Sequence, residues 1–350
     1  MKAWVHHAHR GPLTLDEVAD PDPGPAGLVI AVDCCGLCHS DLHRWTGTSD
    51  HGSRGVITRP LPPRPIAMGH EIVGHIVACG PEVANRSVGE KVIVYPWFGC
   101  GTCKACLAGE DNLCAGPSRS LGFANHGGFA ERVAVPHERY AVPLGDLDPA
   151  RAAPLACAGL TARCAIRKIE PFDPSEKLLV IGAGGVGLTG VAVLSALGHR
   201  NIVVVDRDPA RAEAVTAAGA QQFVVADPGL TAEALAETLG GKVGTVLDFV
   251  NSSATAALAL GMLAKGGRMV QVGLYGGEIV IPLPLLTGSA LTVQGSITGS
   301  LRDLEDVVDL ARRGVLPETP RQTAAFETVN TSLEKLERGE VVGRLVLTSG

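Results

Sequence analysis

From about residue 155 the sequence alternates short apolar runs with stretches of helical periodicity, and this alternation is the feature that most constrains the fold. The apolar runs are LLVIG, IVVVD, QFVVA, TVLDFV and GRMVQVG, and helical stretches separate them. Strands that alternate with helices are joined by crossover connections, which build parallel sheets with helices on both faces. The sequence therefore predicts an α/β fold with a doubly wound parallel sheet over residues 155–293.

The first apolar run leads directly into a glycine-rich turn at the start of a predicted helix. The pattern is G-x-G-G-x-G, formed by Gly182, Gly184, Gly185 and Gly187, with Val186 between the last two glycines. Glycines at these positions permit a tight turn and a close approach of the backbone, so that a pyrophosphate can bind at the helix N-terminus. The motif predicts a dinucleotide site, and the alternative interpretation is a tight turn that binds no ligand.

The second apolar run ends on an acid that bears on the choice of dinucleotide. Asp206 closes IVVVD, 19 residues after Gly187. A carboxylate at this place can accept hydrogen bonds from both adenosine ribose hydroxyls, and it repels the additional phosphate of NADP, so the sequence favours NAD. Arg207 follows directly and could soften this repulsion, and Arg211, one helical turn further on, could reach the ribose. For each arginine a solvated surface position is an equally open interpretation.

Residues 1–154 have a different texture, with short strand-like runs broken by proline and glycine. Runs such as LVIAVDCCG, EIVGHIVACG and GEKVIVYPW predict an all-β region with functional loops rather than helices. A chain of 350 residues exceeds the size at which a single core keeps growing, so we expect two domains. After residue 293 the sequence predicts a helix at LRDLEDVVDLARRG, another near LEKLERG, and a final strand at GRLVLTS.

Four cysteines lie close together in the segment FGCGTCKACLAGEDNLC. Cys100, Cys103, Cys106 and Cys114 form the spacing C-x2-C-x2-C-x7-C, and the neighbouring glycines allow the loop to turn round a tetrahedral metal. Four thiolate ligands leave no open position, so this pattern predicts a structural Zn²⁺. The alternative is that four unrelated thiols fall at this spacing by chance.

The composition excludes several classes of partner. The formal net charge is −6, charged residues make up 19% of the chain, and no long run of one sign occurs, so nothing favours nucleic acid or an anionic membrane surface. The N-terminal stretch lacks the apolar region of a signal peptide, and no apolar run reaches the length of a membrane span. We expect a cytoplasmic protein, in which disulfides rarely persist.

A second set of metal-binding residue types is spread along the chain. Cys38 lies in CCGLCHSDLH, His70 and Glu71 lie in MGHE, and Cys157 lies where the β-rich half meets the dinucleotide half. Two thiolates and an imidazole suit zinc, and three protein ligands leave one position for water or substrate, as in a catalytic site. For Cys157 the alternative interpretation is burial as a small apolar side chain.

With these motifs, the chain resembles the zinc-dependent medium-chain alcohol dehydrogenases, and most closely their bacterial and archaeal NAD-dependent branch. The resemblance rests on C-G-L-C-H-S-D-L-H, G-H-E, the four-cysteine lobe, G-A-G-G-V-G and V-G-R-L, and it covers essentially the whole chain. It implies a GroES-like catalytic domain (1–154 and 294–350), a Rossmann coenzyme domain (155–293), and two Zn²⁺ per chain. It also implies reversible oxidation of primary and secondary alcohols with hydride transfer to NAD⁺. A homotetramer, or alternatively a dimer, would pair through EIVIPLPLLTGSALTVQGS.

The resemblance also implies roles for single residues. Cys38, His70 and Cys157 match the ligands of the catalytic zinc, and Ser40 and His43 match the two ends of a proton relay. The remaining matches are Asp41 and Glu71 as carboxylates behind the zinc ligands, Thr161, Val272 and Arg344 near the coenzyme, and Trp97, Leu121 and Ile297 at the wall of the substrate pocket.

Other functions of the same motifs stay open. A polyol or threonine dehydrogenase would share the fold but would commonly carry an acid in place of Cys157, and a zinc-free quinone reductase would lack the metal ligands. A non-catalytic sensor that binds NAD or zinc would have no need of Ser40 and His43. The segment 44–67 is either a lip over the substrate entrance or an ordinary surface loop.

Overall fold

The second half of the chain forms a six-stranded sheet in the computed structural model, which describes residues 1–349. Every neighbouring pair of strands is parallel, and the strand order is β13-β12-β11-β14-β15-β16. The predicted doubly wound parallel sheet is therefore confirmed. The strands are β11 (Leu178–Ile181), β12 (Ile202–Asp206), β13 (Gln222–Val225), β14 (Val243–Asp248), β15 (Leu263–Gln271) and β16 (Thr292–Gly295).

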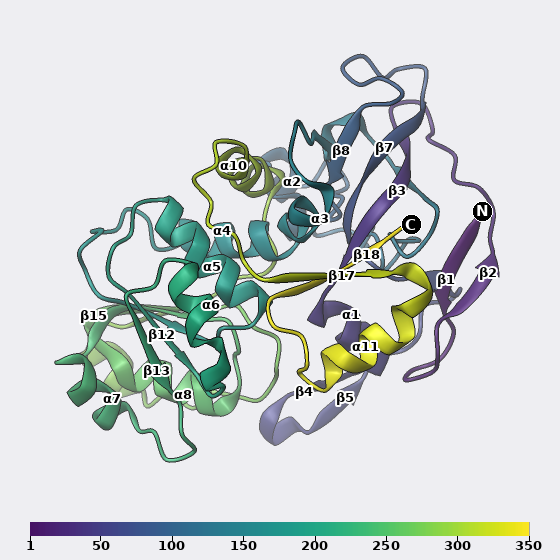
Figure 1. Cartoon of the computed structure of the whole chain (residues 1–350). Coiled ribbons are helices and arrows are strands. Elements are labelled where there is room, and N and C mark those ends of the chain that lie inside the picture. Colours follow the sequence, from purple (N-terminus) through teal and green to yellow (C-terminus); the bar gives the residue numbers. More distant parts are fainter. Residues whose placement is uncertain (350) are drawn as a thin grey trace.

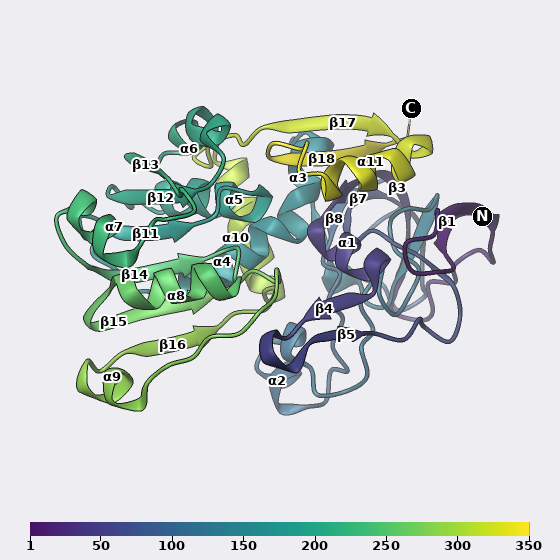
Figure 2. The ribbon, with the colours of Figure 1, turned by 90° about the horizontal axis from the view of Figure 1, so that it is seen from below.

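Helices connect these strands and cover the sheet (Figures 1 and 2). They are α5 (Gly185–Ala196), α6 (Ala212–Ala217), α7 (Ala232–Leu239), α8 (Ser253–Met262) and α9 (Leu283–Gly288). The chain order reverses between β11 and β14, and the loops that follow adjacent strands diverge at such a point and leave a crevice for a ligand. The glycine-rich turn follows β11, so it lies at this reversal.

The first half of the chain is built round a seven-stranded sheet. Its order is β10-β8-β7-β3-β18-β17, with β9 also paired to β3, and a three-stranded sheet of order β2-β1-β6 lies apart from it. The strands are β1 (Lys2–His6), β2 (Thr14–Glu17), β3 (Leu28–Leu37), β6 (Ile66–Ala67), β7 (Glu71–Cys79), β8 (Lys91–Val94), β9 (Arg132–Val135) and β10 (Ala141–Pro143).

The C-terminal segment returns to the sheet of the first half (Figure 1). It comprises α10 (Leu301–Arg312), β17 (Arg321–Ala325), α11 (Val329–Glu337) and β18 (Arg344–Thr348). Strand β18 runs antiparallel to β3, with Leu345 opposite Leu37, so that Arg344 lies beside the end of β3. The predicted helices and final strand are confirmed, whereas the domain boundaries at residues 154 and 294 stay a prediction.

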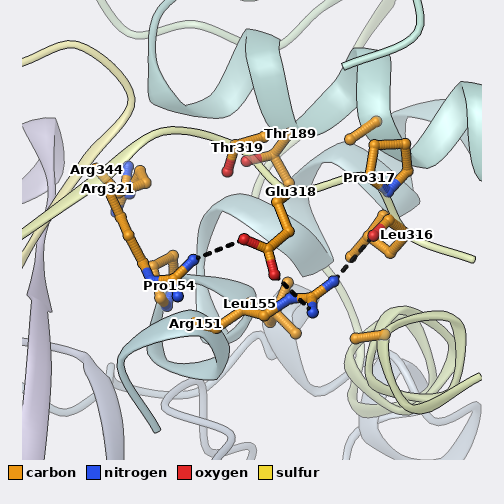
Figure 3. Close-up of a pocket in the computed structure, with 12 residues that line it drawn as sticks. Arg151, Pro154, Leu155, Thr189, Leu316, Pro317, Glu318, Thr319, Arg321 and Arg344 are labelled. Atoms are coloured by element: carbon orange, nitrogen blue, oxygen red, sulfur yellow. Dashed lines mark hydrogen bonds and ion pairs between the residues drawn. The ribbon is translucent and has the colours of Figure 1, made fainter. Parts of the chain in front are cut away.

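Ion pairs fix the segment that carries the chain back between the two halves (Figure 3). Glu318 accepts from Arg151 at 3.0 Å and from Arg321 at 3.4 Å, and Arg151 also donates to the carbonyl of Leu316 at 3.0 Å. The side chains of Arg151 and Arg321 are partly buried, so these contacts are screened less than fully exposed pairs. They hold the segment 316–321 against α3 (Pro149–Ala152).

The expectation that residues 1–154 form an all-β region is wrong, most importantly at residues 39–46. Residues His39–Thr46 form α1, and α2 (Lys104–Leu107) and α3 are also helical, whereas α4 (Ala158–Arg167) comes after this half. The Asp41 carboxylate accepts the backbone N–H of Cys38 at 2.9 Å and closes the first turn of α1. A helix of eight residues with three buried side chains offers too little periodicity to be recognised among strand-like runs.

The segment 44–67 contributes a hairpin of β4 (Thr48–Asp50) and β5 (Val56–Thr58) that reaches the other half of the molecule (Figure 2). The carbonyl of Asp50 accepts the N–H of Gly277 at 3.1 Å, and the Ser53 hydroxyl donates to Glu278 at 2.6 Å. The hairpin therefore bridges the two halves. None of the helices over residues 1–349 combines the length and apolarity needed to span a membrane.

Candidate functional site

Four buried side chains from three parts of the chain meet at the junction of the two halves. One ligand atom each of Cys38, His70, Glu71 and Cys157 lies within 4.8 Å of the others, and all four residues are buried. Cys38 follows β3, His70 and Glu71 stand at the start of β7, and Cys157 precedes α4. The strands thus bring together residues that are up to 119 positions apart.

Asp41 fixes the orientation of the His70 ring. Its Oδ1 atom lies 3.2 Å from Nδ1 of His70 and also accepts the N–H of Gly69 at 3.3 Å. Both side chains are almost fully buried. With Nδ1 held by the carboxylate, Nε2 of His70 is left without a hydrogen-bond partner among residues 1–349. A buried imidazole with one nitrogen bound by a carboxylate and the other free is typical of a metal ligand.

Cys38 and Cys157 face each other across the cluster, with their sulfur atoms 3.8 Å apart. Their hydrogen bond holds the pKa of Cys38 well below its usual range and raises the pKa of Cys157 well above it. The pair therefore retains one proton unless a cation neutralises both thiolates. Two sulfurs at about 2.3 Å from one tetrahedral zinc lie about 3.8 Å apart, so both the spacing and the donor types fit zinc.

Glu71 and Arg344 join this cluster to the glycine-rich turn. Arg344 donates to Oε1 of Glu71, and both side chains are buried. Burial raises the pKa of Glu71 to about 8, although Arg344 opposes this shift. Arg344 also packs against Gly185, where a Cβ atom would lie 2.6 Å from the arginine Cδ. Glu71 was predicted behind the zinc ligands and Arg344 near the coenzyme. In the structure these two side chains are in direct contact.

The two predicted relay residues lie on helix α1. Ser40 and His43 are three positions apart and hence on one face, and both are partly buried. Burial lowers the pKa of His43 below its usual range, because the charged ring is poorly solvated there, and nearby Arg59 adds to this effect. The ring is therefore neutral near pH 7 and available as a proton acceptor.

Aromatic side chains line one side of His70. The ring centroids of Trp97 and Phe123 lie 5.5 and 5.2 Å from that of His70. Of the three predicted pocket residues, only Trp97 contacts this group. Leu121 is buried in the hydrophobic core, and Ile297 is 55% exposed. The sequence did not single out Phe123, because an aromatic residue in a glycine-rich loop carries no pattern of its own.

The four cysteines of the lobe converge on one point. Their sulfur atoms lie within 4.8 Å of one another. Backbone N–H groups donate to these sulfurs, from Cys103 to Cys100 at 3.4 Å and from Gly116 to Cys114 at 3.3 Å. Hydrogen bonds, the first from the Thr102 hydroxyl, lower the pKa of Cys100 to about 5, whereas burial raises that of Cys106 to about 12. Four converging thiols that accept hydrogen bonds from backbone N–H groups fit a zinc site with four sulfur ligands.

Ion pairs tie this lobe to the helices that lie between the two sheets. Glu110 accepts two hydrogen bonds from Arg167 at 2.9 and 3.3 Å, and Arg167 also pairs with the buried Asp303 at 3.1 Å. Arg167 ends α4, the helix that begins directly after Cys157. A change in the shape of the lobe is therefore transmitted to the helix that positions one ligand of the buried cluster.

The glycine-rich turn has the geometry that a dinucleotide requires. Gly182 has a φ of 95°, which L side chains rarely adopt. A Cβ atom on Gly187 would lie 1.9 Å from the carbonyl oxygen of Gly182, so only glycine lets α5 approach β11 this closely. Helix α5 begins at Gly185 and leaves the N–H groups of its first turn, including that of Val186, free for an anion.

Asp206 lies beside this turn at the end of β12. Its two carboxylate oxygens accept the N–H groups of Ala183 at 2.6 Å and Asp208 at 2.9 Å, which fixes the side chain while leaving lone pairs for a ribose. Arg211 pairs with Asp208 at 3.2 Å and lies 3.7 Å from Asp206. Arg207 is exposed. Arg211 thus lies beside Asp206, whereas Arg207 lies at the surface.

Three further residues border the crevice. Thr161 stands in α4 and donates its backbone N–H to the carbonyl of Cys157 at 2.9 Å, and Val272 follows β15 and is buried. His39 received no role from the sequence, yet burial lowers its pKa, and Arg344 and Arg211 add to this shift. Its position directly after Cys38 could have revealed it. Arg344 and Arg211 are the cations at this crevice, and each is paired with a carboxylate, Arg344 with Glu71 and Arg211 with Asp208.

Comparison with protein families matches both halves of the chain. The model of the alcohol dehydrogenase GroES-like domain matches residues 24–146, and the model of the zinc-binding dehydrogenase family matches residues 185–313. The expected GroES-like domain is thereby confirmed.

Full-length relatives agree with this result. An NAD-dependent alcohol dehydrogenase of Saccharolobus solfataricus is 36% identical, over 96% of each chain. The alcohol dehydrogenase of Aeropyrum pernix has a similar structure, with a TM-score of 0.88, 30% identity and complete coverage of both chains. The acetophenone reductase of Geotrichum candidum, solved in complex with NAD, gives a TM-score of 0.86 at 27% identity, over 99% of this chain and 97% of that one.

We predict that Cys103→Ser lowers the zinc content of the purified protein from two ions to one per chain. It should also lower Tm by about 5 °C or more, because a structural zinc contributes folding energy. Zinc analysis and thermal unfolding measure the two effects. Cys79→Ser, which changes a cysteine outside both clusters, is the matched control. A Cys103→Ser protein that keeps two zinc ions and its Tm would contradict a zinc in the lobe.

We also predict that Asp206→Asn shifts the choice of coenzyme. Loss of the carboxylate charge removes the repulsion of the NADP phosphate, so the ratio of kcat/KM for NADP⁺ over NAD⁺ should rise about tenfold or more. Steady-state kinetics with both coenzymes measure this ratio. Asp227→Asn, at an exposed acid beyond β13, should leave it unchanged. An unaltered ratio in Asp206→Asn would mean that Asp206 does not contact the ribose.

Proposed function

The chain belongs to the zinc-binding alcohol dehydrogenases, and we propose that it reversibly oxidises primary and secondary alcohols to aldehydes and ketones with hydride transfer to NAD⁺. The observation that carries this proposal is the buried cluster at the junction of the two halves. Two sulfurs 3.8 Å apart and an imidazole nitrogen without a hydrogen-bond partner among the described residues would supply three zinc ligands and would leave a fourth position for the oxygen of a substrate.

The ligands and their supports have separate roles. Cys38, His70 and Cys157 would hold the zinc, and Asp41 keeps Nδ1 of His70 occupied so that Nε2 points to the metal. When bound, zinc increases the acidity of an alcohol hydroxyl, and NAD⁺ accepts the hydride. The carboxylate of Glu71, held by Arg344, lies close enough to join the ligands or to stay behind them.

The proton of the alcohol needs a route out of the buried site. The Ser40 hydroxyl is the first acceptor on α1, and it can pass a proton on because a hydroxyl both donates and accepts. His43, on the same face of the helix and partly exposed, is neutral near pH 7 and receives the proton on its way to solvent. Two residues of one short helix thus connect the interior with the surface.

The coenzyme would lie along the crevice at the reversal of strand order. The free N–H groups at the start of α5 would receive the pyrophosphate, Asp206 the adenosine ribose, and Thr161 and Val272 would border the nicotinamide. Arg211 and Arg344 add the positive charge that a pyrophosphate requires. The β4–β5 hairpin, which contacts Glu278, would form a lip over the entrance between the halves.

The test is NAD⁺ reduction by the purified protein at mildly alkaline pH with a panel of short, branched, cyclic and benzylic alcohols. Cys38→Ser should lower kcat/KM by about a thousandfold or more, because several kcal/mol of transition-state stabilisation are lost with the metal. NAD⁺ binding, followed by fluorescence, should persist in this variant, and Cys79→Ser should retain full activity. Turnover of polyols alone would indicate a polyol dehydrogenase, and NAD⁺ binding without any turnover would indicate a sensor.

We further propose that the protein is a homotetramer, or alternatively a dimer, in which subunits pair along β16. This strand ends the parallel sheet, and all four of its residues are exposed. Val280 and Leu283, which precede it, are 80% and 73% exposed. An open sheet edge beside exposed apolar side chains is suited to pairing with a second copy.

Val280→Asp should therefore shift the protein to a smaller species in light scattering coupled to size exclusion. Val88→Asp, which places the same charge at an exposed valine of the first half, should leave the mass unchanged. A monomeric wild-type protein, or an unaltered mass in Val280→Asp, would contradict pairing at this edge.

We place the enzyme in the cytoplasm. This proposal is supported by ten cysteines that form no disulfide within the described chain and by the gathering of six of them in two clusters of metal-binding side chains. Thiolates stay free for zinc in a reducing compartment.

A further inference from the structure

The tip of the β4–β5 hairpin is held against the loop that follows β15 in the other half of the molecule (Figure 2). The Ser53 hydroxyl donates to Oε2 of Glu278 at 2.6 Å, and the backbone N–H of Gly277 donates to the carbonyl of Asp50 at 3.1 Å. We call these four residues the clasp. Hydrogen bonds from Ser53, together with the nearby charge of Arg54, hold the pKa of Glu278 below its usual range, so the carboxylate is ionised at neutral pH.

Glycines on both sides of the clasp allow the two loops to come this close. A Cβ atom on Gly52 would lie 2.6 Å from Cγ of Glu278, and one on Gly276 would lie 2.8 Å from the carbonyl oxygen of Asp50. The φ angles of the two glycines are 63° and 110°, which L side chains rarely adopt. The close approach therefore depends on the residue types of both loops.

Each side of the clasp is attached to an element of the functional site. Gly47, directly before β4, donates its N–H to the carbonyl of His43 at 3.1 Å and ends α1, the helix of the proton relay. On the other side, the loop of Glu278 starts beyond Val272, which borders the crevice. The N–H of Glu278 donates to Oγ of Ser253 at 2.9 Å, at the first residue of α8. The clasp therefore connects the relay helix with the loop beside the coenzyme.

The clasp is a weaker connection between the halves than the packing near the metal cluster. Arg344, which packs against Gly185, is buried, whereas Ser53 and Glu278 are exposed to water. Val56 of the hairpin is 66% exposed, so it adds little apolar contact. Regions held by solvent-exposed hydrogen bonds and few apolar contacts open at low cost, while the buried core stays closed. The hairpin can therefore separate from the loop without unfolding of either half.

We propose that the clasp is a gate over the coenzyme crevice, and that its opening limits the rates at which NADH enters and leaves. NADH would lie between the hairpin with α1 on one side and the loop after Val272 on the other, which rests on the coenzyme position proposed for the enzyme. Because the clasp uses only groups of the chain itself, it closes over the empty and the occupied crevice alike. Weakening it should raise the association and dissociation rate constants together and leave their ratio, the Kd, nearly unchanged.

The test is stopped-flow fluorescence of NADH binding to the full-length enzyme, with no alcohol present. We expect Ser53→Ala to raise both rate constants about threefold to tenfold, because a charge-assisted hydrogen bond is lost at an exposed position. The Kd from equilibrium titration should stay within about twofold of that of the wild type, since the free and the bound enzyme are affected equally. Ser87→Ala, at an exposed serine elsewhere in the first half, is the matched control and should leave both rate constants unchanged.

A double-mutant cycle tests whether the two side chains act as a pair. Glu278→Gln should also raise both rate constants, because its neutral amide accepts a weaker hydrogen bond from Ser53. If the pair acts through this hydrogen bond, Ser53→Ala combined with Glu278→Gln should raise the rate constants no further than the larger of the single changes.

Unchanged rate constants in Ser53→Ala would overturn the gate. So would a raised dissociation rate constant with an unchanged association rate constant, because the clasp would then contribute to affinity and not to access. Additive effects in the double variant would refute the pairing of Ser53 with Glu278. A wild-type enzyme that binds no NADH would contradict the proposed function, and the gate with it, whereas normal NADH binding with wild-type kinetics in Ser53→Ala would refute the gate alone.

Discussion

The structure depends on the need to neutralise charge at one buried place. Cys38, His70, Glu71 and Cys157 meet where water is excluded, and two thiols 3.8 Å apart cannot both ionise there without a cation. A divalent metal held by these side chains would remove this conflict and would join β3, β7 and α4 at a single point. The contact between the two halves and the chemistry of the site therefore have the same physical origin.

The surrounding scaffold serves to hold these groups in place. Asp41 binds the His70 ring and caps α1 with the same carboxylate. Arg344, delivered by the C-terminal strand β18, binds Glu71 and packs on Gly185, so it links the metal cluster to the coenzyme turn. The cysteine lobe reaches the same region through Glu110 and Arg167. Each support contacts two functional elements, which makes the arrangement sensitive to single substitutions.

Local patterns in the sequence predicted local structure well. The lobe cysteines lie close together in the sequence, and so do the glycine motif and Asp206. In the structure the members of each set lie near one another. Helix α1 was missed because eight residues with few buried side chains show little periodicity. The meeting of Cys38 with Cys157 depends on tertiary packing, so it was expected from their metal-binding residue types and from family resemblance rather than from a local pattern.

The most direct test of the account is X-ray diffraction at the zinc absorption edge from crystals of the enzyme with NAD⁺. The account predicts two anomalous peaks per chain. One should lie among the four lobe sulfurs, and the other should lie between Cys38, His70 and Cys157 with a non-protein oxygen in its remaining position. A chain with no peak at the buried cluster would contradict the account. So would a peak whose fourth ligand is Glu71 in every state of the enzyme, because no position would remain for a substrate.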